Sequence, residues 1–185
     1  MVFGILGVLL TVRQNVWCWP AGIVNVLLFT LVFFHARLYG SSALQVVYLV
    51  LSVYGWRQWL HGGAGHGRLA VSRTPRSWAV ALGVSGLLAA AVLGYLLSSR
   101  TNAALPYLDA ATTIFSLVAQ WMTTRKWVEN WLIWIGVDVV YVGMYTSQRL
   151  YPTSVLYAVF LGLAVLGWRE WRRSMCQAPP QGAGE

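Results

Sequence analysis

Six apolar runs, each long enough to cross a membrane as a helix, constrain this chain more than any other feature. They cover residues 16–34, 41–60, 77–98, 106–124, 129–147 and 151–171. A spanning helix needs about 20 residues. Charged residues make up only 10% of the chain, whereas a soluble domain carries roughly 25%. We therefore predict an all-α integral membrane protein.

A seventh apolar run opens the chain, from Val2 to Val12. At about 1.5 Å per residue it covers little more than half of a ~30 Å hydrocarbon core. It lacks the positive leader and the cleavage site of a signal peptide. We expect it to be the inner part of a first helix whose outer end is missing or unusually short, which brings the total to seven transmembrane helices.

The distribution of basic residues indicates how these helices are oriented in the membrane. Ten of the 13 Lys and Arg residues fall on one side of the predicted topology, and three, Arg37, Arg100 and Arg149, fall on the other. The positive-inside rule then makes the C-terminus cytoplasmic. Because these charges are scattered over helix ends and loops, the net charge of +8 reflects topology, and we expect no nucleic-acid partner.

The chain contains an internal repeat with a shift of 112 positions. The shift lays Trp19 over Trp131, the run 37–39 over 149–151, and "YGWRQW" over "LGWREW". Each repeat holds three helices, and a fourth helix lies between the repeats. Three helices and one linker helix cross the membrane four times, so the second repeat begins on the same side as the first and has the same orientation. We therefore predict two parallel three-helix repeats joined by a linker helix (3+1+3), with a solute site between them near mid-bilayer.

This architecture divides the chain into five parts. We expect a first three-helix bundle at 1–60, a flexible and basic cytoplasmic loop at 61–77, a linker helix at 78–98, a second three-helix bundle at 105–173 and a disordered cytoplasmic tail at 174–185. His61 and His66 have no third ligand nearby, so we expect no metal site. Interfacial anchoring accounts for the tryptophans at the basic helix ends; these are Trp17, Trp56, Trp59, Trp127, Trp168 and Trp171.

Asp138 stands in the middle of the apolar stretch "WLIWIGVDVVYVGMY", where a charge costs about 2.5–3.5 kcal/mol. Trp131, Trp134, Tyr141 and Tyr145 fall on the same helix face, within about 80°. Two indoles beside a carboxylate suit a flat, cationic ring. We predict that this face lines an internal cavity for a small, polar, cationic solute.

Polar residues of other predicted helices are expected to face the same cavity, because polar groups at this depth usually turn toward the bundle interior. The candidates are Asn25, Gln45, Tyr48, Ser52, Asp109, Thr113, Ser116 and Gln120. For Ser52, Thr112 and Thr113, hydrogen bonding between helices is the better interpretation.

The pattern W-x-x-W-x-x-x-(N/D) in "WLIWIGVD", with Gln120 and "RKWVENW" before it, resembles the PnuC family of nicotinamide riboside transporters. The resemblance extends from Arg13 to Arg173. It implies a fold similar to full-length SWEET sugar transporters, a homotrimer and a bacterial cytoplasmic membrane. It also implies a substrate pocket formed by Trp131, Trp134 and Asp138, which polar residues including Gln120, Asn25 and Gln45 join.

The family resemblance further implies facilitated diffusion of the riboside without a cofactor, and retention through phosphorylation by a separate cytoplasmic kinase. Thiamine, another flat cation, remains an alternative solute, and a deoxynucleoside explains Asp138 less well. An intramembrane aspartyl enzyme would need Asp109 and Asp138 to share a proton. Their predicted depths differ by roughly 9 Å, which is too far.

Overall fold

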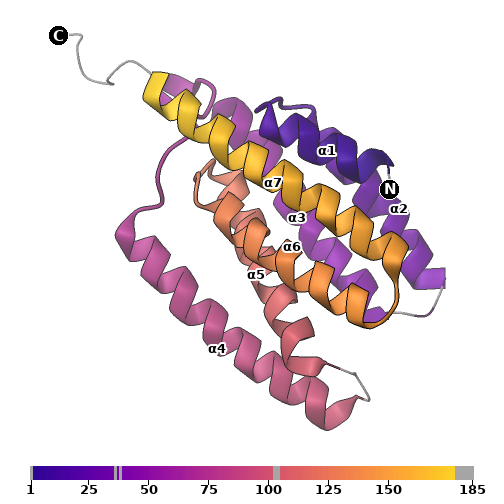
Figure 1. Cartoon of the computed structure of the whole chain (residues 1–185). Coiled ribbons are helices and arrows are strands. Elements are labelled where there is room, and N and C mark those ends of the chain that lie inside the picture. Colours follow the sequence, from indigo (N-terminus) through magenta and orange to yellow (C-terminus); the bar gives the residue numbers. More distant parts are fainter. Residues whose placement is uncertain (1, 36, 38, 102–104, 178–185) are drawn as a thin grey trace.

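The structure, a computed structural model, describes residues 2–35, 37, 39–101 and 105–177, which form seven α-helices and one short 3₁₀-helix (Figure 1). The elements are α1 (Val2–Val12), α2 (Cys18–His35), α3 (Tyr39–His61), η1 (Ala64–His66), α4 (Arg76–Arg100), α5 (Pro106–Thr124), α6 (Asn130–Ser147) and α7 (Tyr151–Gln177). The predicted all-α fold with seven helices is confirmed.

The bounds of α4 and α7 differ from those expected. The linker helix α4 spans Arg76–Arg100 and so extends two residues beyond each end of the predicted 78–98. Helix α7 continues to Gln177, so residues 174–177, which we expected in a disordered tail, are helical. The rest of the expected tail, 178–185, lies outside the described residues.

The helix boundaries repeat with the shift found in the sequence. Helix α2 begins and ends 112 positions before α6, α3 begins 112 positions before α7, and α1 ends 112 positions before α5. The loops repeat as well. Gln14 and Lys126 have φ values of 54° and 52°, and Arg37 and Arg149 both have 59°. Positive φ is uncommon outside glycine, so its recurrence at equivalent positions shows that both repeats share one backbone path.

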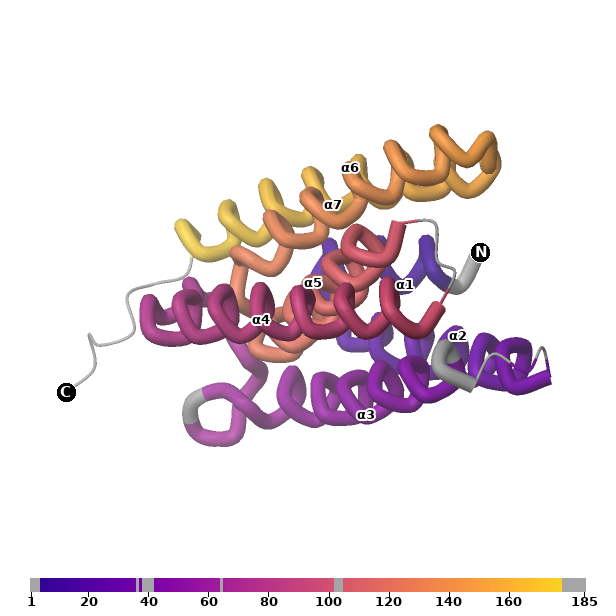
Figure 2. The backbone as a smooth tube through the Cα atoms, turned by 90° about the horizontal axis from the view of Figure 1, so that it is seen from below, coloured from indigo at the N-terminus to yellow at the C-terminus, as the bar shows by residue number. Residues whose placement is uncertain are grey.

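Six of the helices form a closed ring. Going round it, α1 packs against α2, α2 against α3, α3 against α5, α5 against α6, α6 against α7, and α7 against α1. Figure 2 shows α6 and α7 on one side and α2 and α3 on the other, with α1 and α5 between them. The two repeats therefore meet along two interfaces, α3 with α5 and α7 with α1.

Helix α4 lies outside the ring, along α5 (Figure 1). Its buried positions, Gly86, Ala90 and Gly94, are spaced by four residues and form one face. Gly86 lies against Phe115 and Gly94 against Tyr107 of α5. Small residues at this spacing let two helices approach closely, so the small-residue face of the linker packs within the chain.

Helices α2, α4 and α7 are each long and apolar enough to cross a membrane by composition alone, and they are the three of this kind among the described residues. Helices α3, α5 and α6 are 23, 19 and 18 residues long. They carry most of the polar residues that turn into the ring, which lowers their mean hydropathy. The outward faces expose large apolar side chains, as lipid contact requires.

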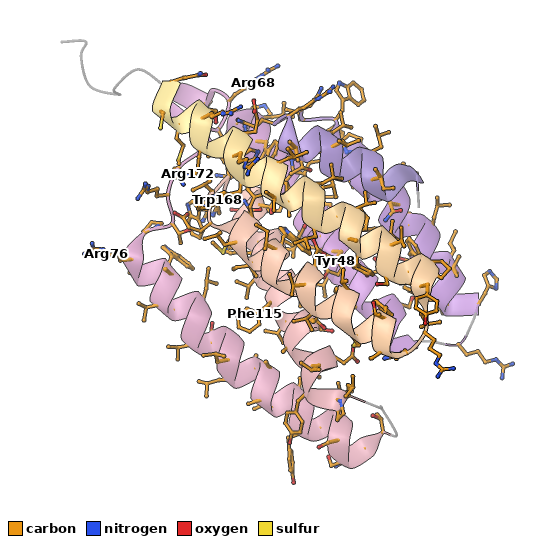
Figure 3. The ribbon with its side chains drawn as sticks, viewed as in Figure 1. Tyr48, Arg68, Arg76, Phe115, Trp168 and Arg172 are labelled. Carbon is orange, nitrogen blue, oxygen red and sulfur yellow. The ribbon has the colours of Figure 1, made fainter. Side chains whose placement is uncertain are left out.

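The densest packing lies at one end of the ring. Four tryptophans meet there, Trp19, Trp59, Trp131 and Trp171, each at most 3% exposed. Figure 3 shows Arg68, Arg76, Trp168 and Arg172 toward this same end, which we call the basic end. Interfacial anchoring fits Trp17 and Trp56, which are 70% and 39% exposed, but it is wrong for Trp59 and Trp171, which have no exposed surface. Both pack against helices of the opposite repeat instead.

The loop between α3 and α4 is tied to the loop between α5 and α6. The backbone N–H of Ser72 donates to the Lys126 carbonyl at 3.1 Å, and the N–H of Val128 donates to the Ser72 carbonyl at 3.0 Å. Glu129 accepts two further hydrogen bonds at 2.8 Å, from the backbone N–H and the hydroxyl of Thr74. The expected flexible linker is therefore wrong for residues 72–74.

Candidate functional site

A cavity of about 720 Å³ lies inside the ring. All six ring helices contribute lining residues, and α4 contributes none among the described residues. Pockets for small molecules commonly enclose about 300–1,000 Å³, so this cavity has the size of a vitamin or nucleoside site. Asp109 and Phe29 line it and are also exposed, so the cavity opens away from the basic end.

The structure brings every predicted site residue to this one cavity. The ten residues come from α2, α3, α5 and α6, and they are Asn25, Gln45, Tyr48, Ser116, Gln120, Trp131, Trp134, Asp138, Tyr141 and Tyr145. Asp109, Thr113 and Ser52, which the sequence also placed on inward faces, line the cavity too. The part that these side chains play in binding remains a prediction.

Asp138 is the buried acid of the cavity, with 4% of its surface exposed. Within the described part of the chain, its carboxylate has no ion pair and no hydrogen bond. A buried charge without a partner is costly. The carboxylate therefore provides an open place for a cationic or hydrogen-bonding group of a solute.

Trp131 and Trp134 precede Asp138 on the same helix and line the cavity with it. Trp131 is 3% exposed and meets Trp171 edge to face, with ring centroids 5.4 Å apart. Its indole N–H is buried and has no hydrogen-bond partner among the described residues. Trp134 is more accessible, one turn nearer to Asp138. An indole and a carboxylate on one helix face are well placed to hold an aromatic cation.

A cluster of tyrosines lies beyond Asp138, toward the open end. Tyr157 of α7 contacts Tyr141 and Tyr145 of α6, with ring centroids 4.5 and 5.3 Å apart. Tyr48 of α3 and Ser116 of α5 line the cavity together with these tyrosines. The polar side chains at this end of the cavity therefore come from both repeats.

The two walls of the cavity differ in chemistry although they share a backbone plan. Polar or aromatic residues on α5 and α6 correspond, 112 positions earlier, to small or apolar residues on α1 and α2 that also line the cavity. The pairs are Ser116 and Gly4, Gln120 and Val8, Trp134 and Gly22, Asp138 and Val26, Tyr141 and Phe29, and Tyr145 and Phe33. At these positions the side of the cavity formed by α5 and α6 is therefore more polar than the side formed by α1 and α2.

Sequence reasoning missed several aromatic lining residues. Trp19 and Tyr157 line the cavity, and neither was among the candidates. Trp19 is the repeat partner of Trp131, so the shift of 112 positions contained the signal for it. Tyr157 is the partner of Gln45, but the residue types differ, and its inward direction follows only from the packing of α7 against α6.

Within the ranges that the structure describes, no three His, Cys, Asp or Glu side chains come together as a ligand set. The arrangement offers binding chemistry: a carboxylate, amides, hydroxyls and aromatic faces around a cavity that opens at one end.

A cavity of this size inside a ring of helices with an apolar outer surface is typical of a membrane transporter for a small molecule. The family described as "Nicotinamide mononucleotide transporter" matches residues 1–173. The chain belongs to this family, also called the PnuC family, and it is a multi-pass membrane transporter and not an enzyme.

Individual relatives are named for different vitamins. The nicotinamide riboside transporter PnuC of Escherichia coli K12 is 27% identical, covering 94% of this chain and 83% of its own length. The riboflavin/roseoflavin transporter RibM of Streptomyces davaonensis is 28% identical, covering 92% and 81%. A crystal structure of the vitamin B3 transporter PnuC superposes with a TM-score of 0.73 at 24% identity, covering 96% of this chain and 80% of that chain.

Proposed function

We propose that this chain takes up nicotinamide riboside by facilitated diffusion with alternating access. The observation that carries the proposal is the buried carboxylate of Asp138, which lines the cavity without an ionic partner among the described residues. A cationic solute supplies the missing charge. In a site shielded from water, such an attraction counts far more than it would in solution.

The other lining groups suit the rest of the riboside. Its pyridinium ring is flat and cationic, and the indole faces of Trp131 and Trp134 attract such rings. Its carboxamide and ribose hydroxyls need donors and acceptors, which the side-chain amides of Gln120 and Asn25 provide together. All four residues line the one cavity, so a single bound solute can meet them at once.

The setting of this activity is also part of the proposal. The chain lies in a bacterial cytoplasmic membrane as a homotrimer, with its C-terminus in the cytoplasm. A separate cytoplasmic kinase phosphorylates the riboside and so keeps it in the cell. Ten of 13 basic residues on one side of the topology support this orientation.

Riboflavin is the second candidate, because a riboflavin/roseoflavin transporter is 28% identical over 92% of this chain. Riboflavin is an uncharged aromatic solute, so it would use the aromatic lining and would leave Asp138 without a charge partner. Thiamine is a third candidate, since it matches the charge of the riboside. The three solutes therefore separate the contribution of charge from that of aromatic stacking.

Uptake into proteoliposomes tests the proposal. Purified protein should equilibrate labelled nicotinamide riboside across the bilayer, while excess thiamine or riboflavin should compete weakly. Proton and sodium gradients should not change the final internal concentration. Uptake of riboflavin or thiamine in place of the riboside would overturn the substrate assignment. Accumulation above equilibrium that depends on either gradient would overturn facilitated diffusion.

A further inference from the structure

Two matched hydrogen bonds join the repeats at the basic end. The indole Nε1–H of Trp59 on α3 donates to the backbone carbonyl of Thr123 on α5 at 3.0 Å. The indole Nε1–H of Trp171 on α7 donates to the backbone carbonyl of Thr11 on α1 at 3.1 Å. The donors lie 112 positions apart, and so do the acceptors. Each bond crosses one of the two interfaces between the repeats.

The rings of these tryptophans fill the space between the bonds. Trp19 meets Trp59 edge to face with centroids 5.4 Å apart, and Trp131 meets Trp171 at the same separation. Trp59 and Trp171 meet each other at 5.9 Å. The four rings thus form a continuous chain from one wall of the ring to the opposite wall, and all four are buried.

This chain of rings borders the solute cavity. Trp19 and Trp131 line the cavity, and so do Thr11 and Thr123, whose carbonyls accept the two hydrogen bonds. Trp59 and Trp171 lie behind them with no exposed surface. The cavity is therefore closed at the basic end by the same residues that hold the repeats together there.

We propose that the four tryptophans form the gate at the basic end of the transporter, and that the Trp59–Thr123 and Trp171–Thr11 hydrogen bonds are its two latches. A rocking motion that parts α3 from α5 and α7 from α1 breaks both latches and separates the four rings in one step. Release of solute to the basic side requires this opening. The gate does not depend on which vitamin the cavity binds.

Different side chains lie near the two latches in the two repeats. The Lys126 ammonium lies 4.4 Å from the centre of the Trp59 ring. At the equivalent position Gln14 donates to the Ser174 hydroxyl at 2.9 Å. Both Gln14 and Lys126 have positive φ, so the two loops share this backbone conformation.

The native cysteines make the gate measurable. Cys18 lines the cavity next to Trp19 and is buried, whereas Cys176 is exposed near the end of α7. The sequence has two cysteines, so Cys176→Ser leaves Cys18 as the single thiol. The probe is a small, membrane-impermeant methanethiosulfonate, applied to sealed vesicles of either orientation and read by intact mass. Labelling of Cys176 in the natural chain identifies the side that carries the basic end.

Replacing Trp59 or Trp171 by phenylalanine keeps a ring and removes the donor. Each latch contributes about one neutral hydrogen bond, so each single variant should raise the rate of Cys18 labelling from the basic side about 5-fold, and the double variant about 25-fold. Trp127→Phe is the matched control, since Trp127 is buried at the same end and packs against Trp78, outside the four-ring cluster.

Labelling of Cys18 from the opposite side serves as the test of folding, and it should stay within about 2-fold of the parent. Where the double variant fails this test, the single variants decide. Unchanged labelling from the basic side in the folded tryptophan variants would overturn the gate. So would an equal increase in Trp127→Phe, because the increase would then reflect general loosening of that end.

Discussion

Asp138 of α6 and Val26 of α2 occupy equivalent positions in the two repeats, and both line the same cavity. Helices α2 and α6 lie opposite each other in the ring, so one wall carries a charge and the facing wall does not. Internal repetition has supplied a symmetric frame, and substitution within one repeat has given it a polar side. In the proposed transport cycle, the two like halves rock against each other and the unlike walls orient the solute.

On the α2 side of the cavity, the small residue Gly22 leaves space for the solute. We therefore predict that only a small side chain is tolerated at this position. Gly22 is the equivalent of Trp134, and a methyl group added there meets nothing within 4 Å. Gly22→Ala should therefore retain uptake, whereas Gly22→Trp should fill the cavity and reduce uptake by 10-fold or more. Uptake in proteoliposomes measures both. Full activity of folded Gly22→Trp protein would show that the solute occupies another part of the cavity.

Gly55 and Gly167 leave space for the rings of the cavity tryptophans, so replacing either glycine should destabilise the fold. A methyl group added at Gly55 would overlap the ring of Trp19, and one added at Gly167 would lie 2.5 Å from the ring of Trp131. Gly55→Ala and Gly167→Ala should each cost about 1–3 kcal/mol through overpacking. Gly162 lies on the same helix as Gly167, and a methyl group added there meets nothing within 4 Å. Gly162→Ala should therefore be neutral or stabilising by up to about 1 kcal/mol. The unfolding midpoints of the three variants in detergent give the comparison. Equal midpoints would contradict the close packing of Gly55 and Gly167 against the tryptophan rings.

The lowered pKa of Lys126 leads us to predict that stability depends on pH. Burial lowers the pKa of Lys126 to about 8, against an opposing effect of Cys18 and with a reinforcing effect of Arg68. An exposed lysine in the unfolded chain titrates near 10.4. Between these values the unfolded chain holds a proton that the folded chain has released, so the free energy of unfolding rises with pH.

The variant Lys126→Met removes this contribution. Between pH 7.5 and 9.5 the natural chain should gain about 1–2 kcal/mol of stability relative to the variant. Because Lys126 is the only lysine in the sequence, isotope-labelled lysine gives one side-chain NMR signal whose titration reports its pKa directly. An NMR signal that titrates near 10.4 would contradict the claim that burial lowers the pKa of Lys126. So would an equal dependence of the free energy of unfolding on pH in the natural chain and in Lys126→Met.

Glu129 and Thr74 link the loop before α4 to the loop before α6. The two hydrogen bonds of 2.8 Å are charge-assisted, so Glu129→Ala should cost about 1.5–3 kcal/mol. Glu129→Gln keeps an acceptor oxygen and should lose less. A double-mutant cycle with Thr74→Val measures the coupling through unfolding midpoints. Additive losses would show that the two side chains act independently.

Sequence reasoning located the polar face of α6 because helical periodicity is a local property. Once Trp131 and Asp138 lie on one helix, a rotation of 100° per residue fixes their relative direction, and the cost of a buried charge points that face inward. The repeat then defined the frame, since equivalent residues such as Trp19 and Trp131 must lie at equivalent places.

What the sequence did not reveal depends on contacts between distant segments. A tryptophan at a helix end satisfies interfacial anchoring and tertiary packing equally well, so Trp59 and Trp171 were interpreted as anchors. Their complete burial and their hydrogen bonds to Thr123 and Thr11 distinguish the two roles. The pairing of Ser72 with the backbone near Trp127 is an isolated bridge, and no periodic pattern accompanies such a contact.

Titration of nicotinamide riboside against purified natural protein, Asp138→Ala, Asp138→Asn and Thr113→Ala tests the central claim most directly. The account predicts that Asp138→Ala weakens binding about 30-fold or more, as loss of one partner of a buried charge pair does. Asp138→Asn should fall between Asp138→Ala and the natural protein, and Thr113→Ala should lose much less affinity. Equal affinities of Asp138→Ala and Thr113→Ala would contradict the claim that this carboxylate binds the solute.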